Sequence, residues 1–133
     1  MRKLSLFLFA VVGCLSLWGQ GATDGKIFKI KTNNSSLTLF AGNDSLLYQL
    51  GYGSLQAPES TIPPKGIARE KEFYPPSGNG FIAEPAIEVN HADGNTSTDL
   101  YYQNHEVKQI DSNIDLTVIH LKDPQYPFFV DIY

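Results

Sequence analysis

Turn-forming residues interrupt this chain so often that no stretch after Lys26 carries an apolar helix period over a useful length. Short runs rich in β-branched and aromatic residues lie between the turns, and such runs favour strands. Seven runs have this character: residues 27–32, 37–41, 45–52, 86–90, 100–107, 114–122 and 128–133. Their number and spacing predict an all-β fold, an antiparallel β-sandwich.

The connections between these runs predict how the strands are ordered. Residues 33–36 and 42–44 are short and rich in Asn, Ser, Gly and Asp, which is typical of turns between neighbouring antiparallel strands. The first three runs should therefore form a three-stranded meander. In the run 114–122, Leu116 and Ile119 point to opposite faces, so both faces carry apolar residues and the run should be a central strand.

Residues 53–80 cannot form a central strand, because proline, which has no backbone N–H, recurs through them. The prolines are Pro58, Pro63, Pro64, Pro75 and Pro76. We expect a long ordered loop here. A connection of this length inside a compact domain is uncommon, and when ordered it is usually functional or packed against another part of the protein. We expect this loop to be the binding element of the chain.

The composition is that of a folded globular protein, with 42% hydrophobic and 18% charged residues. The formal net charge is -4, from 10 basic and 14 acidic side chains. Without Arg2 and Lys3 the balance becomes more acidic by two charges. No basic run follows Lys3, so the chain lacks the clustered cations that phosphate backbones require, and we exclude nucleic acid as a partner.

The first residues have the layout of a secretory signal peptide, expected at residues 1–21. A basic start precedes an apolar run, residues 4–12, and small residues follow it. The run is shorter than the roughly 20 residues of a membrane span. Residues 11–14, Val-Val-Gly-Cys, resemble a lipobox, so lipid anchoring at Cys14 is the alternative to cleavage near Gly21. Either route leads to an exported protein, periplasmic or extracellular.

The stretch 84–107 reads EPAIEVNHADGNTSTDLYYQNHEV, two strand-like runs around an Asp93-Gly94 turn. Its EPA, HADG and DLYY motifs resemble, in order and spacing, the N-terminal β-sandwich domain of bacterial alpha-galactosidases of glycoside hydrolase family 36. Residues 46–53, LLYQLGYG, and 119–128, IHLKDPQYPF, resemble further strands of that domain. The resemblance covers about residues 27–133 of this sequence.

This resemblance implies that residues 26–133 are an incomplete, supersandwich-type N-terminal domain of a longer enzyme. In the family, two catalytic aspartates lie in a later (β/α)8 barrel. The enzyme hydrolyses terminal α-galactosides with retention of configuration, and it needs no metal or organic cofactor. The implied partners are that barrel, sister subunits and galactoside oligosaccharides. A loop of the N-terminal domain can reach the active site of a neighbouring subunit in this family, a role that residues 53–80 would suit.

Three carboxylates, Glu84, Glu88 and Asp93, are close enough in sequence to suggest a glycosidase pair, which needs two carboxyl groups across the scissile bond. Asp93 precedes Gly94, however, in a pattern typical of a tight turn. We assign no catalytic residue in this chain, and we expect the EPA and HADG motifs to be structural.

Metal and cofactor sites have equally weak support. His91 and Asp93 have the spacing of two ligands on one face of a strand, and His105 or His120 could add a third. A stronger site would carry a tighter cluster, so we expect His91 to hydrogen-bond locally and predict no metal site. No Gly-rich phosphate loop precedes a helix, so no cofactor-binding residue is assigned either.

A second hypothesis is a free-standing secreted sandwich that binds carbohydrate or protein without catalysis. Such modules stack a sugar ring on an exposed aromatic side chain. Phe73, Tyr74 and the pair Tyr101-Tyr102 could serve, although we expect these rings to pack in the core. A third hypothesis is a different glycoside hydrolase with a similar leading sandwich. A reading frame that continues beyond codon 133 into a barrel would favour the enzyme, and a stop there would favour the binding module.

Overall fold

The computed structural model describes residues 25–56 and 69–133. The expected signal peptide at residues 1–21, with Cys14, lies outside the described residues, and so do residues 57–68 of the expected loop. In the described ranges, no helix has both the length and the apolar character needed to cross a membrane.

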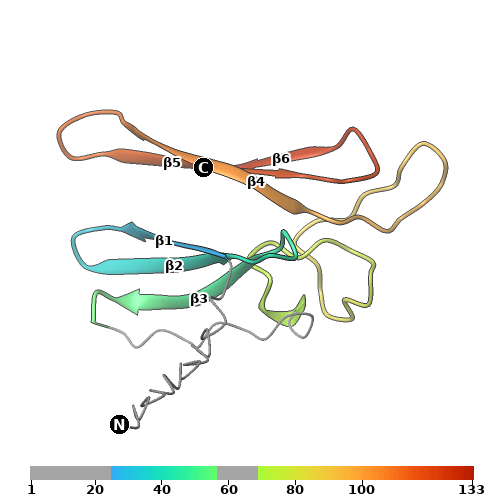
Figure 1. Ribbon diagram of the computed structural model, residues 1–133, viewed down its shortest axis with the longest axis horizontal. Coiled ribbons are helices and arrows are strands. Elements are labelled where there is room, and N and C mark those ends of the chain that lie inside the picture. Colours follow the sequence, from blue (N-terminus) through green and yellow to red (C-terminus); the bar gives the residue numbers. More distant parts are fainter. Residues whose placement is uncertain (1–24, 57–68) are drawn as a thin grey trace, which may run out of the picture.

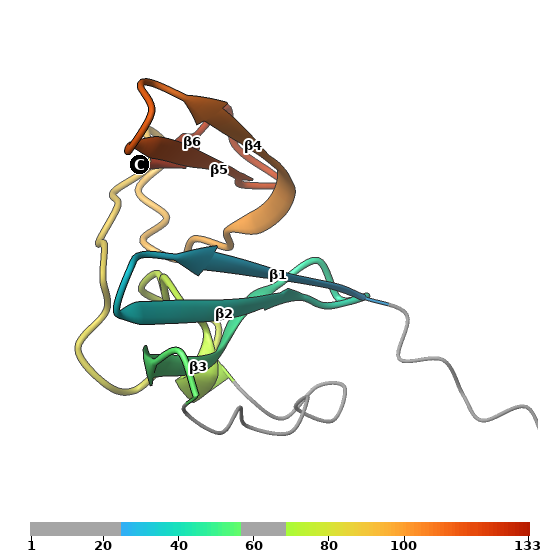
Figure 2. The ribbon, with the colours of Figure 1, turned by 90° about the vertical axis from the view of Figure 1, so that its left-hand side faces the viewer.

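The chain forms two antiparallel three-stranded sheets that face each other in two layers (Figures 1 and 2). The elements are β1 Lys26–Lys31, β2 Ser35–Ala41, β3 Leu47–Ser54, η1 Arg69–Lys71, β4 Tyr101–Gln109, β5 Asp115–Lys122 and β6 Phe129–Ile132. The first sheet has the order β1-β2-β3 and the second the order β4-β5-β6. The predicted all-β sandwich, its three-stranded meander and the central position of the strand at 114–122 are confirmed.

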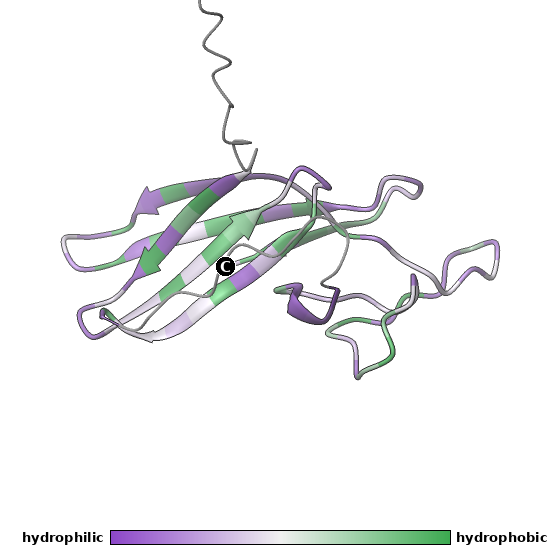
Figure 3. Cartoon of the chain, turned by 60° about the horizontal axis from the view of Figure 1, so that its bottom comes forward, coloured by the Kyte–Doolittle hydropathy of each residue, from purple (hydrophilic) through white to green (hydrophobic). Residues whose placement is uncertain are grey.

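The core is the apolar layer between the two sheets. Its buried members are Leu39, Ala41, Leu47, Leu100, Ile119 and Leu121. Leu39 comes from the central strand β2 and Ile119 from the central strand β5, and both are almost fully buried. Successive side chains of a strand point to opposite faces of the sheet. Hydrophobic and hydrophilic residues accordingly alternate along several strands (Figure 3). A smaller cluster on the other face of the first sheet consists of Phe40, Leu46, Tyr48 and Leu50.

Local hydrogen bonds explain why the meander turns where the sequence predicts. Between β1 and β2, the Thr32 hydroxyl accepts the Ser35 N–H at 3.0 Å. Between β2 and β3, the Asp44 carboxylate accepts the Leu46 N–H at 3.1 Å, and Ser45 has a positive φ of 65°. Short polar side chains that bond to the backbone two or three residues on favour such turns.

One predicted strand is wrong, because residues 86–90 form no strand. Ile87 makes only an isolated parallel bridge with Pro76, in which the Ser77 N–H donates to Ile87 O at 3.0 Å. Pro75 O accepts the Ala86 N–H at 2.8 Å, but proline has no N–H to donate back, so the pairing cannot continue as a ladder through Pro75. The described residues therefore contain six strands rather than seven.

The expected loop also begins later than predicted. Gly53 and Ser54 still pair with β2 and belong to β3. Further along, residues 69–71 form the short helical turn η1. Residues 57–68 lie outside the described part, so the predicted order of the whole loop stays a prediction.

His105 of β4 contacts β1 across the space between the two sheets. Its ring stacks on Phe28, with the ring centroids 3.9 Å apart, and its Nδ1 shares a hydrogen bond of 2.6 Å with the Tyr102 hydroxyl. Burial lowers the pKa of His105, and the nearby charge of Lys26 lowers it further. The neutral ring is therefore the form that fits between the sheets.

We expect the contribution of His105 to the free energy of unfolding to decrease as the pH falls below about 6.5, the ordinary pKa of histidine. In that range the unfolded chain binds a proton at His105 more readily than the folded chain does, so protonation favours unfolding. His105→Gln removes this contribution, so the free energy of unfolding of the wild type relative to this variant should decrease as the pH falls, measured by urea unfolding at several pH values. Gln109→Asn, on the same strand, should keep the wild-type pH dependence. An unchanged slope in His105→Gln would contradict the assignment.

Candidate functional site at the loop end of the sandwich

The long segment before β4 and the connection between β5 and β6 lie at the same end of the sandwich, on the right of Figure 1. Residues 69–100 lead into β4 there, and residues 123–128 connect β5 to β6. We call these two segments the loop end. The loop end holds most of the buried polar side chains of the described residues, namely Glu72, His91, Thr98 and Asp123.

A tight turn at residues 78–81 shapes the first part of the loop end. The Phe81 N–H donates to Gly78 O at 3.0 Å. Positive φ values of 49° at Asn79 and 84° at Gly80 make this a type I′ turn, which favours Asn-Gly. The Asn79 N–H donates to Ser97 Oγ at 3.2 Å, so the turn is tied to the segment that enters β4.

Asp123 is the polar centre of the loop end, and the carboxylate residue is only 2% exposed. Its Oδ1 accepts the N–H of Gln125 at 2.7 Å and the N–H of Tyr126 at 2.9 Å. Its Oδ2 accepts the N–H of Asp99 at 3.1 Å. Such hydrogen bonds replace the lost water and make the burial tolerable. One side chain thus closes the β5–β6 connection and fastens it to the segment before β4.

Tyr126 and His91 join the β5–β6 connection to the second tight turn. Their rings stack with centroids 3.5 Å apart, and His91 Nε2 shares a hydrogen bond of 3.0 Å with Thr98 Oγ1. The Tyr126 hydroxyl donates to Asp93 Oδ2 at 2.9 Å. The Gly94 N–H donates to His91 O at 2.8 Å. The predicted Asp93-Gly94 turn and the local hydrogen bonding of His91 are both confirmed, although no strand ladder flanks the turn.

The three carboxylates weighed as a glycosidase pair are not assembled for catalysis. The pKa of Asp93 is lowered, first by the N–H of Asn95 and then by the Tyr126 hydroxyl, whereas a glycosidase acid needs a raised pKa. Glu84 and Glu88 are both exposed. Glu88 lines a shallow cleft of about 480 Å³ whose other lining residues are Ser77, Gly78, Val89, Asn90 and Thr96. Neither Glu84 nor Asp93 lines this cleft.

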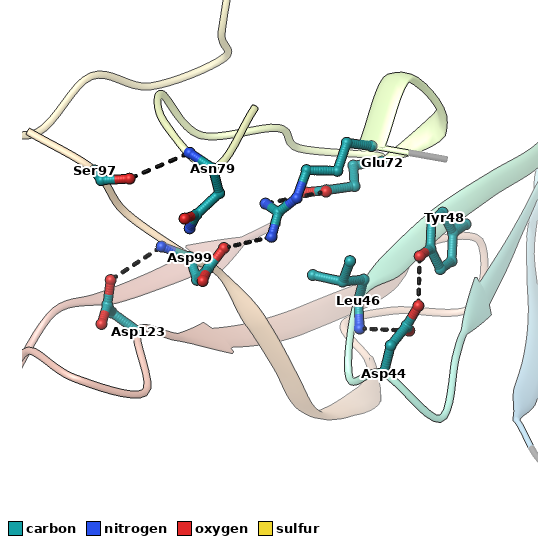
Figure 4. Close-up of polar contacts among 9 residues, drawn as sticks. Asp44, Leu46, Tyr48, Glu72, Asn79, Ser97, Asp99 and Asp123 are labelled. Atoms are coloured by element: carbon teal, nitrogen blue, oxygen red, sulfur yellow. Dashed lines mark hydrogen bonds and ion pairs between the residues drawn. The ribbon is translucent and has the colours of Figure 1, made fainter. Parts of the chain in front are cut away.

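Arg69, Glu72 and Asp99 form an ion-pair group that the sequence did not suggest (Figure 4). Arg69 Nη2 donates to Asp99 Oδ1 at 2.8 Å, and Arg69 Nη1 lies 3.5 Å from Glu72 Oε1. Glu72 also pairs through its backbone with Tyr48 of β3. Burial raises the pKa of Glu72 to about 7, Arg69 opposes this shift, and the negative charges of Asp99 and Asp44 add to it.

The three histidines lie in three different places. His91 belongs to the loop end and His105 lies between the sheets. His120 lies on the outer face of the second sheet, where its Nδ1 is 2.7 Å from Asp131 Oδ1. Among residues 25–56 and 69–133, no group of three or more candidate ligands is arranged to hold a metal ion. The His91 and Asp93 half-site thus receives no third ligand from the other two histidines.

The aromatic side chains considered as sugar platforms pack in the two apolar clusters. Phe73, Tyr74 and Tyr102 contact the core between the sheets, and Tyr101 packs against the cluster on the other face of the first sheet. The expectation of core packing is confirmed. The sequence gives no signal for Tyr126, because the partners of its side chain lie more than 30 positions away and leave no local pattern.

A small polar cavity of about 130 Å³ lies within the loop end. Its lining residues are Asn79, Asn95, Ser97, Asp99, Asp123, Pro124, Gln125 and Tyr126. Since liquid water occupies about 30 Å³ per molecule, the cavity has room for roughly four waters. Several lining groups already bond to one another, so the arrangement holds the loops together.

Residues 38–133 match the glycosyl hydrolase family 36 N-terminal domain. No curated protein matches the chain. Among solved structures, the crystal structure of the alpha-galactosidase from Lactobacillus brevis is similar, with a TM-score of 0.62 and 18% sequence identity. The similarity covers 80% of this chain and 19% of that chain, so this chain spans only a small part of that enzyme's length. At this identity the likeness shows a shared fold.

The fold and the loop end define a β-sandwich domain in which Asp123 binds backbone N–H groups and His91 binds Thr98. The family match extends over residues 38–133, well over half of the chain. The chain therefore belongs to the N-terminal domains of glycosyl hydrolase family 36. The resemblance carried by the EPA, HADG and DLYY motifs is confirmed.

Asp123→Ala should lower the free energy of unfolding by about 3 kcal/mol, because three backbone N–H groups lose their acceptor and each unsatisfied buried group costs roughly 1–3 kcal/mol. The measurement is the midpoint of urea unfolding. Asp115→Ala removes an exposed carboxylate at the start of β5 and should change the free energy by less than about 0.5 kcal/mol. Equal midpoints for the two variants would show that Asp123 does not hold the loop end together.

Proposed function

We propose that this chain is the non-catalytic N-terminal portion of an exported alpha-galactosidase. The observation that carries the proposal is the family match over residues 38–133, and the two-sheet sandwich supports it. The solved enzyme of similar fold is an alpha-galactosidase, and the matched part is 19% of its chain. The remainder of an enzyme of that size has ample length for a separate catalytic domain.

In this proposal the sandwich supports a catalytic barrel and takes no part in bond cleavage. Retaining hydrolysis needs two carboxyl groups about 5–5.5 Å apart, one as nucleophile and one as general acid. In the described residues, the Asp123 carboxylate accepts three backbone N–H groups, and the Glu72 side chain is buried. The barrel would supply both catalytic carboxylates, and terminal α-galactosides of oligosaccharides would be the substrates.

The remaining partners follow from the same proposal. The sandwich would contact its own barrel and sister subunits. Residues 53–80 would approach the active site of a neighbouring subunit, and part of that segment lies outside the described residues. The motifs EPA and HADG would act by shaping the loop end, where His91 and Asp93 contact Tyr126.

The complete reading frame that contains these 133 codons should encode a protein that hydrolyses an aryl α-galactoside. The 133-residue chain expressed alone should release no aryl group, because the catalytic pair is expected in the barrel. The matching aryl β-galactoside is the control substrate and should not be cleaved by either protein. Hydrolysis by the short chain alone would contradict the proposal. A frame that stops after codon 133, with glycan binding by the chain, would favour the free-standing binding module.

Export is tested separately by expressing the chain in a bacterial host. The domain should accumulate outside the cytoplasm, with a new N-terminus close to Ala22 that mass spectrometry identifies. Cys14→Ser separates the two export routes. This variant should leave the new N-terminus unchanged if cleavage occurs near Gly21, and it should abolish lipid attachment if the lipobox is used. Uncleaved wild-type chain in the cytoplasm would overturn the export proposal.

A further inference from the structure

Glu72 carries the single buried side-chain oxygen without a hydrogen-bond partner in the part of the chain that the structure describes. This oxygen is Oε1, and the side chain is only 4% exposed. Arg69 Nη1 lies 3.5 Å away and forms an ion pair but no hydrogen bond, whereas Nη2 of the same guanidinium donates to Asp99 Oδ1 at 2.8 Å. Burial of a carboxylate oxygen without a hydrogen bond destabilises the folded chain when the carboxyl group is ionised.

The charged and titratable groups that face Glu72 come from each element packed around it. Arg69 belongs to η1, Tyr48 to β3, Asp44 to the β2–β3 turn and Asp99 to the segment before β4. The Tyr48 hydroxyl donates to Asp44 Oδ2 at 2.6 Å, so it is engaged there (Figure 4). The Arg69 guanidinium therefore pairs with two carboxyl groups, those of Glu72 and Asp99, and Asp44 adds a further negative charge near Glu72. Burial and this surplus of negative charge raise the pKa of Glu72 to about 7.

Glu72 lies in the segment 69–73, which docks the loop end on the first sheet. The segment contacts β3 through an isolated bridge between Glu72 and Tyr48 and through the Phe73 N–H, which donates to Leu47 O at 2.8 Å. These contacts do not belong to a longer ladder. Segments held by few contacts open at a lower free energy than the core does.

We propose that Glu72 is a proton-operated latch for residues 69–73. With a proton on its carboxyl group, the side chain stays buried and the segment remains docked on β3, with Arg69 bound to Asp99. When the proton passes to solvent, the carboxylate turns out into water, and the bridge to Tyr48 opens. The loop end is then held less tightly to the first sheet above neutral pH. The latch does not rest on the proposed function.

Hydrogen exchange of the Phe73 amide in the 133-residue chain tests the latch. The amide protection, corrected for the intrinsic pH dependence of exchange, should fall by roughly tenfold or more between about pH 5.5 and pH 8.5. Glu72→Gln mimics the protonated carboxyl and should keep the protection high at both pH values. Glu70→Gln, an exposed change in the same turn, is the matched control and should behave as the wild type does.

A corrected protection that is the same at both pH values in the wild-type chain would overturn the latch. So would a loss of protection at high pH that persists in Glu72→Gln. If that variant does not fold, NMR titration of the Glu72 carboxyl carbon in the wild-type chain decides the question. We expect the Phe73 amide resonance to change with the same midpoint as Glu72, and a midpoint that differs from that of Glu72 would refute the coupling.

Discussion

The apolar layer between the two sheets is the interaction on which the rest of the structure depends. Leu39 of β2 and Ile119 of β5 lie in this layer, each on the central strand of its sheet. Apolar burial stabilises by about 25 cal/mol per Å². Cys14 is the only cysteine of the sequence, so no disulfide within the chain can assist. Packing between the two central strands therefore decides whether the sheets associate at all.

The loop end depends on that packing and also supports it. Once the sheets face each other, Asp123 at the end of β5 can accept the Asp99 N–H at the entrance to β4. Tyr126 can likewise stack on His91. These contacts engage Asp123, Tyr126 and His91 with other groups of the loop end. A domain whose buried polar groups bind within the domain is consistent with the proposed role, the support of a separate catalytic barrel.

Local patterns predicted the fold well and the polar contacts poorly. The turn at Asp93-Gly94 was predictable, because its backbone conformation depends on neighbouring residues alone. Residues 86–90 form no strand, and Ile87 makes a single bridge with Pro76. The alternation of apolar residues in the sequence cannot distinguish such a bridge from a full ladder. The pairing of Arg69 with Asp99 spans 30 positions and leaves no periodic signal. Asp123 belongs to the motif at residues 119–128, but that motif indicates neither its burial nor its three backbone donors.

The sequence by itself determined the all-β class, the meander, the turn positions and the family, because turn chemistry, side-chain alternation and short motifs are local properties of a chain. Only the tertiary structure decided which polar residues meet. Glu72, for example, acquired its buried and under-bonded state from Arg69, Tyr48 and Asp99, which reach it from separate elements. The physical reason is that desolvation and charge interactions depend on distances in space, and these are set only when the two sheets pack.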